Sequence, residues 1–313
     1  MNIAVLGVNR FSCALPLREA FARACLGLSR EERLDPACIL LATCDRTEIY
    51  FSAPDLKSAH SRLLDVLGHQ IPLYAYFDAD CFHHLARVTA GLESAVIGET
   101  EIQRQVKVAY ERGSLCESLP SCMHFLFQKC LKIGKQARSF FPIHPRSSLE
   151  RMILDLTRRF FDSNFSLLFV GNSEINRKIH ACLGLSATVC TRSPMQAQGF
   201  EKVVSWEELD SWQHYDMVIS ATEAADYALT APSTRPECRT RLIVDLSLPR
   251  IVDPAIKAQA GITLLNIEEM ESLLDKNKRQ APLVLQEVEE MIRQEVIKQL
   301  DIFERKESFA CVS

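Results

Sequence analysis

The 313-residue sequence has no apolar run long enough to span a lipid bilayer. Its N-terminal apolar stretch has no basic flank, and Arg10 and Arg18 interrupt the residues after it, so we expect no secretory signal. Neither an internal repeat nor a low-complexity tract is visible. The formal net charge of −4 excludes a uniformly basic nucleic-acid coat. These absences indicate a cytoplasmic globular protein of about two domains.

Metal-binding cysteine patterns are also missing, although the chain has 12 cysteines. None forms a Cys-x-x-Cys pair, and no cysteine–histidine cluster has zinc-finger spacing, so we expect no metal site. Without an export signal, most of these cysteines are expected to be reduced, buried, small apolar residues.

Short apolar runs near the N-terminus alternate with longer amphipathic ones, which predicts a small α/β unit. The expected elements are strands at 2–8, 37–42 and 47–51 and helices at 15–26 and 54–67. From residue 80 to about 141 the pattern is helical, with breaks at Gly91, Gly98 and Gly113. The segment 141–145 contains two prolines and is expected to end this domain.

An unbroken apolar run at 165–170 is typical of a strand that is buried on both faces. It is preceded by an expected helix at about 147–161. Further short strands are expected at 187–190, 216–220, 242–246 and 262–265. Helical stretches or loops lie between them, which predicts an open parallel sheet with helices on both sides.

The last segment, 281–307, has one continuous apolar stripe with spacings of three and four residues. Such a helix packs either on its own chain or on a partner. The sequence therefore divides into an N-terminal α/β domain (1–143), a Rossmann-like α/β domain (144–268) and a long C-terminal helix region (269–313).

Cys44 lies in the tight segment expected between two strands. A cysteine at such a turn can be exposed, and Arg46 can stabilise its thiolate or bind a carboxylate bidentately. Asp45 would raise the pKa of the thiol if it pointed inward. The residue types fit a structural cysteine beside a surface Arg–Glu pair as well, and alone they favour that interpretation.

A histidine pair, His83 and His84, begins the helical region. One of them can act as a general acid or base, because the imidazole pKa lies near neutral pH. A surface pair at a helix start fits equally well.

Gly171 follows the buried strand at 165–170 and precedes a helical stretch, which is the arrangement of a phosphate site. Only the first glycine of a Gly-x-Gly-x-x-Gly turn is present. About 20 residues later the next strand ends near Arg192, and an arginine there favours NADP over NAD. An ordinary surface arginine is the alternative.

Residues 129–159 carry eight cationic and two anionic side chains. Such a patch can contact nucleic-acid phosphates, and it can equally be a solvated helix face.

Longer motifs resemble the glutamyl-tRNA reductase family. ATCDRTEIY (42–50) is similar to the family's STCNRTEIY, and the stretch 84–110 is similar to its HLFxVAxGLDSMVxGEPQIxxQVKxAY. LFQKCLKIGKQAR (126–138), SAT (220–222) and DLSLPR (245–250) also fit. The resemblance covers roughly residues 1–280 and overturns the structural interpretation of Cys44.

This resemblance implies NADPH-dependent reduction of glutamyl-tRNA(Glu) to glutamate-1-semialdehyde, the first step of tetrapyrrole (5-aminolevulinate, haem, porphyrin) biosynthesis. It implies that Cys44 is the nucleophile, which forms a thioester, and that His84 is the second catalytic residue. The implied substrate-binding residues are Thr43, Asp45, Arg46, Ser94, Glu99, Thr100, Glu101 and Gln105. The implied NADPH-binding residues are Gly171, Asn172, Ser173, Glu174, Ile175, Asn176, Thr191, Arg192 and Ser193.

The implied partners are glutamyl-tRNA(Glu) and glutamate-1-semialdehyde aminotransferase. The sequence departs from the family at Ala42 and Asp45, and the family's GAGEMG has become GNSEIN (171–176). Family members continue into a C-terminal helical bundle that forms a homodimer, whereas here the sequence ends soon after the last amphipathic segment. These departures motivate an alternative, a catalytically weakened relative that regulates by binding tRNA or a partner. A dehydrogenase of the shikimate type ranks last, because it does not need the Cys44 motif.

Overall fold

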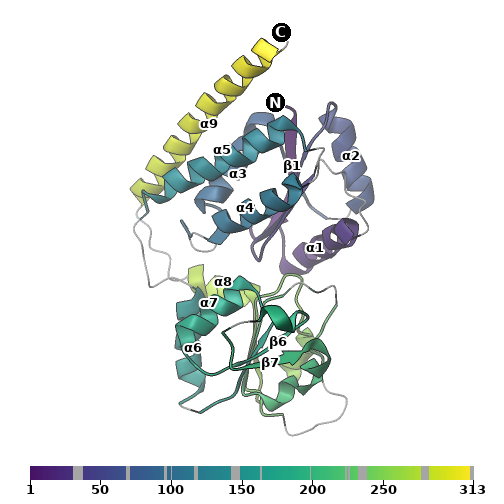
Figure 1. The fold of residues 1–313 in the computed structure, drawn as a ribbon, viewed down its shortest axis with the longest axis vertical. Coiled ribbons are helices and arrows are strands. Elements are labelled where there is room, and N and C mark those ends of the chain that lie inside the picture. Colours follow the sequence, from purple (N-terminus) through teal and green to yellow (C-terminus); the bar gives the residue numbers. More distant parts are fainter. Residues whose placement is uncertain are drawn as a thin grey trace. The chain divides into compact units, whose positions relative to one another are not determined.

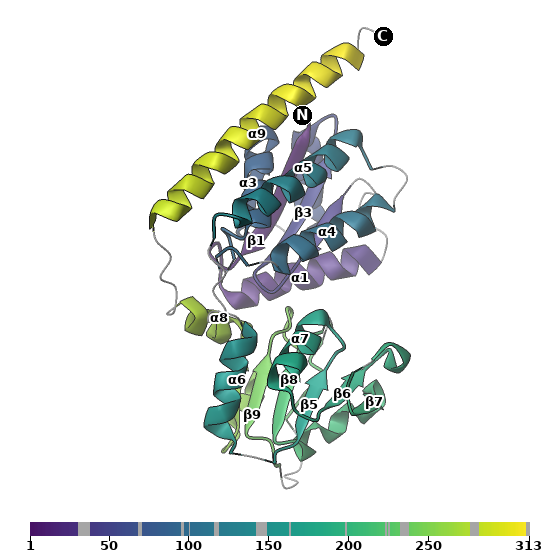
Figure 2. The same ribbon diagram turned by 60° about the vertical axis from the view of Figure 1, so that its left-hand side comes forward.

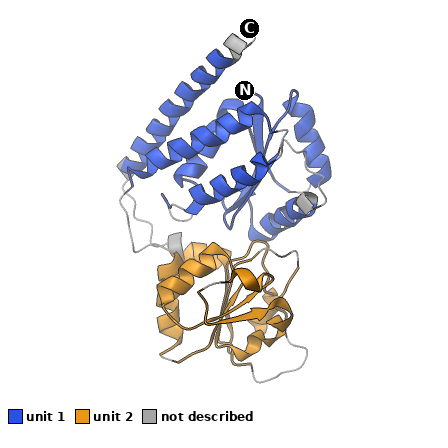
Figure 3. Cartoon of the chain, in the orientation of Figure 1, with its two compact units in different colours: residues 1–144, 278–313 blue, residues 145–277 orange. Residues whose placement is uncertain are grey.

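The computed structural model divides the chain into two compact units, which Figure 3 colours separately. The first unit comprises residues 1–144 and 278–313, and the second comprises residues 145–277. The structure describes residues 1–30, 38–67, 71–94, 97–99, 101–115, 119–141, 149–162, 164–197, 199–222, 224, 226–231, 238–275 and 282–310. The second unit is thus inserted between two segments of the first.

A four-stranded antiparallel sheet forms the centre of the first unit, in the order β2-β3-β1-β4. Its strands are β1 (Ile3–Asn9), β2 (Ile39–Ala42), β3 (Arg46–Ser52) and β4 (Tyr74–Phe77). The first three confirm the sequence prediction. β4 was not predicted, because it is only four residues long and half of it is exposed.

Helices cover both faces of this sheet (Figure 1). α1 (Leu15–Arg30) and α2 (Leu56–Leu67) pack on one face, and α3 (Asp78–Ala90), α4 (Glu101–Ser114) and α5 (Ser121–Arg138) pack on the other. Successive β1 side chains point to opposite faces, so both faces of this strand are apolar. The break predicted at Gly113 is wrong by one residue, since α4 continues through it to Ser114.

The C-terminal helix α9 (Pro282–Ala310) packs on α3 and α5 of the first unit (Figure 2). Its side chains Val288, Ile292 and Phe303 are buried in the core that those helices share, and the Phe303 ring lies 5.1 Å from that of Phe125. The predicted apolar stripe therefore packs on its own chain. Residues 269–277, which the sequence analysis grouped with this helix, belong to the second unit.

The second unit is a parallel six-stranded sheet in the order β10-β9-β8-β5-β6-β7. The strands are β5 (Leu167–Val170), β6 (Thr188–Thr191), β7 (Lys202–Ser205), β8 (Met217–Ser220), β9 (Leu242–Asp245) and β10 (Thr263–Asn266). The helices are α6 (Leu149–Phe160), α7 (Glu174–Leu183) and α8 (Ile267–Asp275). The predicted open parallel sheet is confirmed, and the exposed edge strand β7 is an addition.

The strand order reverses between β5 and β8: the chain first builds outward through β6 and β7 and then returns to build the other half. Ligands of such sheets bind at the carboxyl ends of the strands beside this reversal. Among the described helices, none is both long and apolar enough to cross a membrane.

Candidate active site

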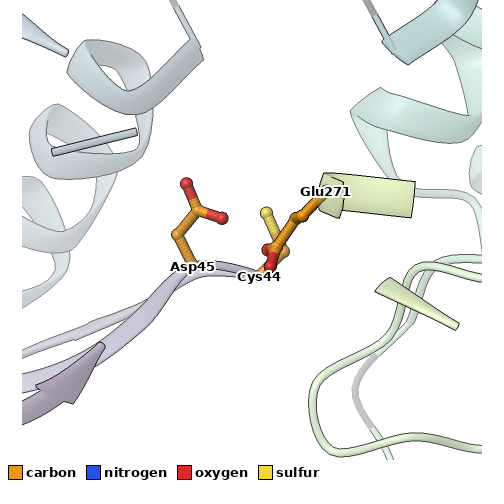
Figure 4. Close-up of side chains that lie close together, drawn as sticks. All are labelled: Cys44, Asp45 and Glu271. Atoms are coloured by element: carbon orange, nitrogen blue, oxygen red, sulfur yellow. The ribbon is translucent and has the colours of Figure 1, made fainter. Parts of the chain in front are cut away.

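Cys44 occupies the turn between β2 and β3, where Figure 4 shows its side chain beside that of Asp45. The Thr43 hydroxyl oxygen accepts hydrogen bonds from the backbone N–H groups of Asp45 and Arg46, both at 3.2 Å. The Thr43 N–H donates to the Arg46 carbonyl at 2.8 Å, which closes the turn. The turn is thus fixed around a half-buried cysteine.

A buried cation supports this turn from α1. The Arg18 side chain is 1% exposed, and its guanidinium donates to the Cys44 carbonyl at 3.3 Å. Sequence analysis missed Arg18 as a site residue, because 26 positions separate it from Cys44 and no local pattern connects them.

Arg46 and Glu48 are completely buried and paired. They lie two positions apart on β3 and therefore share one face of the sheet. The Arg46 guanidinium contacts Glu48 Oε1 at 3.2 Å and donates to the Glu93 carbonyl at 2.6 Å. The structure thus places the predicted carboxylate-binding arginine in an internal ion pair.

Three more donors converge on the Glu48 carboxylate. The Tyr50 and Tyr74 hydroxyls each donate to it at 2.6 Å, and His84 Nε2 lies 2.9 Å from Oε1. Burial opposes its ionisation, but His84 and Arg46 together hold the pKa of Glu48 well below its usual value. Glu48 is therefore a carboxylate at neutral pH.

The two tyrosines stay protonated in this cluster. Burial, together with the adjacent Glu48 carboxylate, raises the pKa of Tyr50 and of Tyr74 well above the usual value. Both phenols are therefore hydrogen-bond donors over the working pH range. We refer to Arg46, Glu48, Tyr50, Tyr74 and His84 as the Glu48 cluster.

The two histidines, His83 and His84, lie in different surroundings. His84 is 7% exposed and faces the sheet, whereas His83 lies 3.5 Å from Glu289 on α9. Only His84 therefore joins the Glu48 cluster.

The other predicted substrate residues lie near the start of α4. Ser94 is buried, and burial and the Asp45 carboxylate raise the pKa of Glu99 to about 8, with the Ser94 hydroxyl acting against this shift. Glu101 instead contacts Arg104 Nε, at 3.0 Å. Gln105 is half-buried on α4, and Thr100 lies outside the described residues.

The glycine turn of the second unit lies between β5 and α7. Gly171 has φ of 93°, and a Cβ there would lie 2.6 Å from the Thr222 Cβ. Ser173 caps α7 and accepts from the Asn176 N–H at 3.3 Å. The N–H groups that begin α7, together with its dipole, suit a phosphate.

Asn176 stands where the usual motif has its third glycine. Its side-chain amide donates to the carbonyls of Val170 at 3.0 Å and Gly171 at 2.8 Å. The replacement of glycine by Asn176 fits the turn, because the Asn176 side chain is completely buried beneath it and binds the end of β5. Asn172 donates to the Gln196 carbonyl at 3.0 Å, Glu174 pairs with Lys178 at 3.0 Å, and Ile175 is half-buried.

Arg192 follows β6 at the same edge of the sheet as Gly171. Its guanidinium lies 5.2 Å from the centre of the Trp206 ring and donates to the Thr222 hydroxyl at 3.4 Å. Thr191 is buried and accepts from the Ser193 N–H at 3.2 Å, while Ser193 is exposed. The residues that the sequence analysis assigned to the cofactor thus gather at the carboxyl ends of β5 and β6.

The SAT and DLSLPR motifs meet at the next strand ends. Asp245 on β9 accepts from the Ser220 hydroxyl at 2.8 Å and from the N–H groups of Ser247, Ile251 and Val252 at 3.0–3.1 Å. Burial raises the pKa of Asp245, and these donors oppose that rise. Asp245 therefore fixes the loop that follows β9.

The basic stretch 129–159 is divided between the two units. Lys129, Lys132, Lys135 and Arg138 belong to α5 in the first unit, and Arg151, Arg158 and Arg159 belong to α6 in the second. Arg146 lies outside the described residues. Lys132 and Lys135 are exposed, whereas Arg138 donates to the Thr89 carbonyl at 3.0 Å.

Comparison with known proteins identifies the class of each unit. Residues 6–140 match the family model of the glutamyl-tRNAGlu reductase N-terminal domain, and residues 166–273 match that of shikimate/quinate 5-dehydrogenase. The chain is therefore an oxidoreductase whose second unit has the fold of the nicotinamide-dependent dehydrogenases.

Full-length relatives narrow this class. Glutamyl-tRNA reductase of Chlamydia pneumoniae is 31% identical over an alignment that covers 98% of this chain and 95% of that protein. The enzyme of Chlamydia trachomatis serovar D is 38% identical over 80% of this chain and 78% of its own. The protein belongs to the glutamyl-tRNA reductase family, as the sequence motifs predicted.

A solved structure agrees in fold. Glutamyl-tRNA reductase from Methanopyrus kandleri aligns with a TM-score of 0.52 and 22% identity, over 97% of this chain and 81% of that one.

Proposed function

We propose that this protein reduces glutamyl-tRNA(Glu) to glutamate-1-semialdehyde with NADPH, the opening reaction of tetrapyrrole synthesis, and that Cys44 is its nucleophile. The observation that carries this proposal is the fixed β2–β3 turn, in which the family's TCxRTE motif presents a half-buried cysteine and the buried Arg18 guanidinium holds the Cys44 carbonyl.

The proposed first step is transfer of the glutamyl group. The Cys44 thiolate attacks the ester carbon that joins glutamate to the 3′ end of the tRNA. A carbon–sulfur bond forms, the carbon–oxygen bond breaks, and the departing ribose oxygen takes a proton. The resulting thioester is more electrophilic than a carboxylate, so it is competent for reduction.

His84 is the proposed source of the proton for the departing oxygen, because it is the buried histidine of the Glu48 cluster. Thr43 and Asp45 belong to the Cys44 turn, and Ser94, Glu99, Thr100, Glu101 and Gln105 would surround the glutamyl group. For Arg46 we retain the assignment to the substrate carboxylate as a prediction, since this guanidinium is engaged with Glu48 in the structure.

NADPH is the cofactor that the second unit would hold. Gly171 to Asn176 would receive the phosphates at the start of α7, and Thr191 to Ser193 would receive the adenosine ribose and its additional phosphate. When bound, it supplies the hydride that converts the thioester to a thiohemiacetal. Collapse of the thiohemiacetal returns the thiolate to Cys44 and releases the aldehyde.

The tRNA is a partner of the whole reaction, and the exposed lysines of α5 are its proposed phosphate contacts. The released aldehyde is the substrate that glutamate-1-semialdehyde aminotransferase consumes, so that enzyme is the proposed second partner. We place the reaction in the cytoplasm.

Replacing the nucleophile tests this function. Cys44→Ser should lower formation of glutamate-1-semialdehyde from charged tRNA and NADPH by at least about 10³-fold, because an alcohol is not deprotonated at neutral pH. Cys182→Ser, at an exposed position in the second unit, is the matched control and should keep wild-type activity. With NADPH withheld, mass spectrometry should find a glutamyl adduct on Cys44. Full activity of Cys44→Ser would refute the proposal.

The alternative, a regulator that binds tRNA or a partner without efficient reduction, rests on the altered glycine turn. Titration of NADPH separates the two functions. Binding in the micromolar range would contradict the regulator, and no binding at millimolar NADPH would favour it.

A further inference from the structure

Two residues of the Glu48 cluster, Glu48 and Tyr74, lie in one row across three strands of the sheet. The proposed function gives neither of them a role. In the register of the sheet, Gly7 of β1 pairs with Glu48 on β3 and with Tyr74 on β4. Directly paired residues of adjacent strands point to the same face. Glu48 and Tyr74 are therefore on one face, with a glycine between them.

The glycine is what lets the two outer side chains meet. A Cβ at Gly7 would lie 2.8 Å from the Glu48 Cγ and 2.6 Å from the Thr47 carbonyl oxygen. The Tyr74 hydroxyl donates to Glu48 Oε1 at 2.6 Å. The row Glu48–Gly7–Tyr74 thus builds a contact across the full width of β1.

His84 approaches the same oxygen atom from α3. Its Nε2 lies 2.9 Å from Glu48 Oε1, and its ring stacks on Tyr76 with a centroid distance of 4.8 Å and an interplanar angle of 29°. Tyr74 flanks the ring at 5.5 Å. The rings of Tyr74 and Tyr76 therefore fix the plane of the imidazole, and the Glu48 carboxylate fixes the direction in which Nε2 points.

The chemistry of the acceptor decides which nitrogen carries the proton. An ionised carboxylate only accepts hydrogen bonds, so the His84 nitrogen that faces it must be N–H in both charge states of the ring. Nδ1 is then the nitrogen whose proton comes and goes. Nδ1 of His84 makes no hydrogen bond to any residue that the structure describes.

We propose that Glu48 and Tyr74 are positioning residues that fix His84 in the Nε2–H form, so that Nδ1 is the atom that delivers a proton in the reaction. Tyr74 acts through Glu48: its hydroxyl holds Oε1 in the direction that His84 needs. The proton-transfer part of this inference rests on the function proposed above, whereas the tautomer does not.

The first test is the tautomer itself, measured on the full chain without substrate. Long-range proton–nitrogen correlation spectra of the ¹⁵N-histidine-labelled protein, with His84 assigned by its loss in His84→Asn, report which nitrogen is protonated in the neutral ring. We expect the Nε2–H form in the wild type. An Nδ1–H form would overturn the inference.

The second test separates positioning from folding. Tyr74→Phe should convert His84 to a mixture of tautomers and lower kcat about tenfold, with KM changed less than about twofold. Tyr110→Phe is the matched control, because it removes a tyrosine hydroxyl elsewhere in the first unit, one that lies 2.9 Å from His124 Nδ1. It should leave the His84 spectrum and kcat unchanged.

Unchanged His84 signals in a folded Tyr74→Phe variant would overturn the role of Tyr74. Retention of the Nε2–H form in a folded Glu48→Leu variant, whose side chain neither donates nor accepts, would overturn the role of Glu48. If the spectra behave as expected while the wild type makes no glutamate-1-semialdehyde, the proposed function fails and the positioning of His84 stands.

Discussion

At the scale of the residue, the decisive feature is one carboxylate shared by four donors. Glu48 binds Arg46, Tyr50, Tyr74 and His84. Tyr74 is half-buried, and the other four side chains of the cluster are buried. Part of this cluster can be predicted from the sequence. Alternation along β3 places Arg46, Glu48 and Tyr50 on one face. Tyr74 and His84 could not be assigned to it, because their approach depends on the strand β4 and on the tilt of α3.

Stability should depend on the ionisation of Glu48. Glu48→Gln leaves the buried Arg46 without its counter-charge, so we expect the free energy of unfolding to fall by about 3–5 kcal/mol at pH 7. The pKa of Glu48 is lowered in the folded state, so its stabilisation is present above the ordinary value of 4.5 and is lost as the pH falls below it. The difference between variant and wild type should therefore shrink at pH 3.5.

Urea unfolding followed by circular dichroism at the two pH values measures this. Glu111→Gln, at an exposed carboxylate paired with Lys107, is the control and should change stability by less than about 0.5 kcal/mol. An equal loss for Glu48→Gln at both pH values would contradict the assignment.

Nucleotide selection should depend on Arg192. Its guanidinium is stacked on Trp206 and presented beside the Gly171 turn, so Arg192→Ala should weaken NADPH binding by about 10- to 100-fold and leave NADH binding nearly unchanged. Fluorescence titration of both nucleotides measures the ratio. Arg151→Ala on α6 is the control, and equal losses for the two nucleotides would show that Arg192 does not read the additional phosphate.

At the scale of the element, the turn between β5 and α7 shows what a motif match can miss. From the sequence, one glycine out of three indicated an eroded nucleotide site. In the structure the first glycine keeps a left-handed backbone, the second position is the helix cap Ser173, and the third is a buried asparagine that bonds to the turn. Strand and helix positions were predictable from apolar periodicity. The roles of Ser173 and Asn176 in the turn were not predictable, because they depend on side-chain directions within it.

Gly171 should therefore tolerate substitution less well than Gly184, which also has a positive φ. Gly171→Ala places a Cβ 2.7 Å from the Ala221 carbonyl oxygen, so we expect loss of NADPH binding and a marked drop in melting temperature. Gly184→Ala is the matched control: φ is 62° there and nothing lies within 4 Å of the added Cβ, so only about 1 kcal/mol of backbone strain is expected. Equal melting temperatures for the two variants would show that the contact with Ala221 is unimportant.

At the scale of the whole molecule, the two units differ in how the chain builds them. The second unit is one continuous segment, 145–277, whereas the first needs residues from both ends of the chain. The apolar stripe of the C-terminal segment predicted an amphipathic helix. Its packing on α3 and α5 could not be predicted, because a single sequence does not show which apolar surface packs on which.

The second unit should be separable. A fragment of residues 145–277 is expected to unfold cooperatively and to bind NADPH within about threefold of the full chain, because it carries the complete parallel sheet with its own core. The fragment 1–144 is expected to aggregate, since removing α9 exposes the apolar surface around Phe125. Thermal circular dichroism and nucleotide titration measure both outcomes. A well-folded fragment 1–144 would contradict the structural role of α9.

The insertion has a consequence for synthesis on the ribosome. Residues 145–277 leave the exit tunnel before α9 does, so the second unit is able to fold while the unit bearing Cys44 still lacks α9. The unit that bears Cys44 is thus completed only after the inserted unit has emerged.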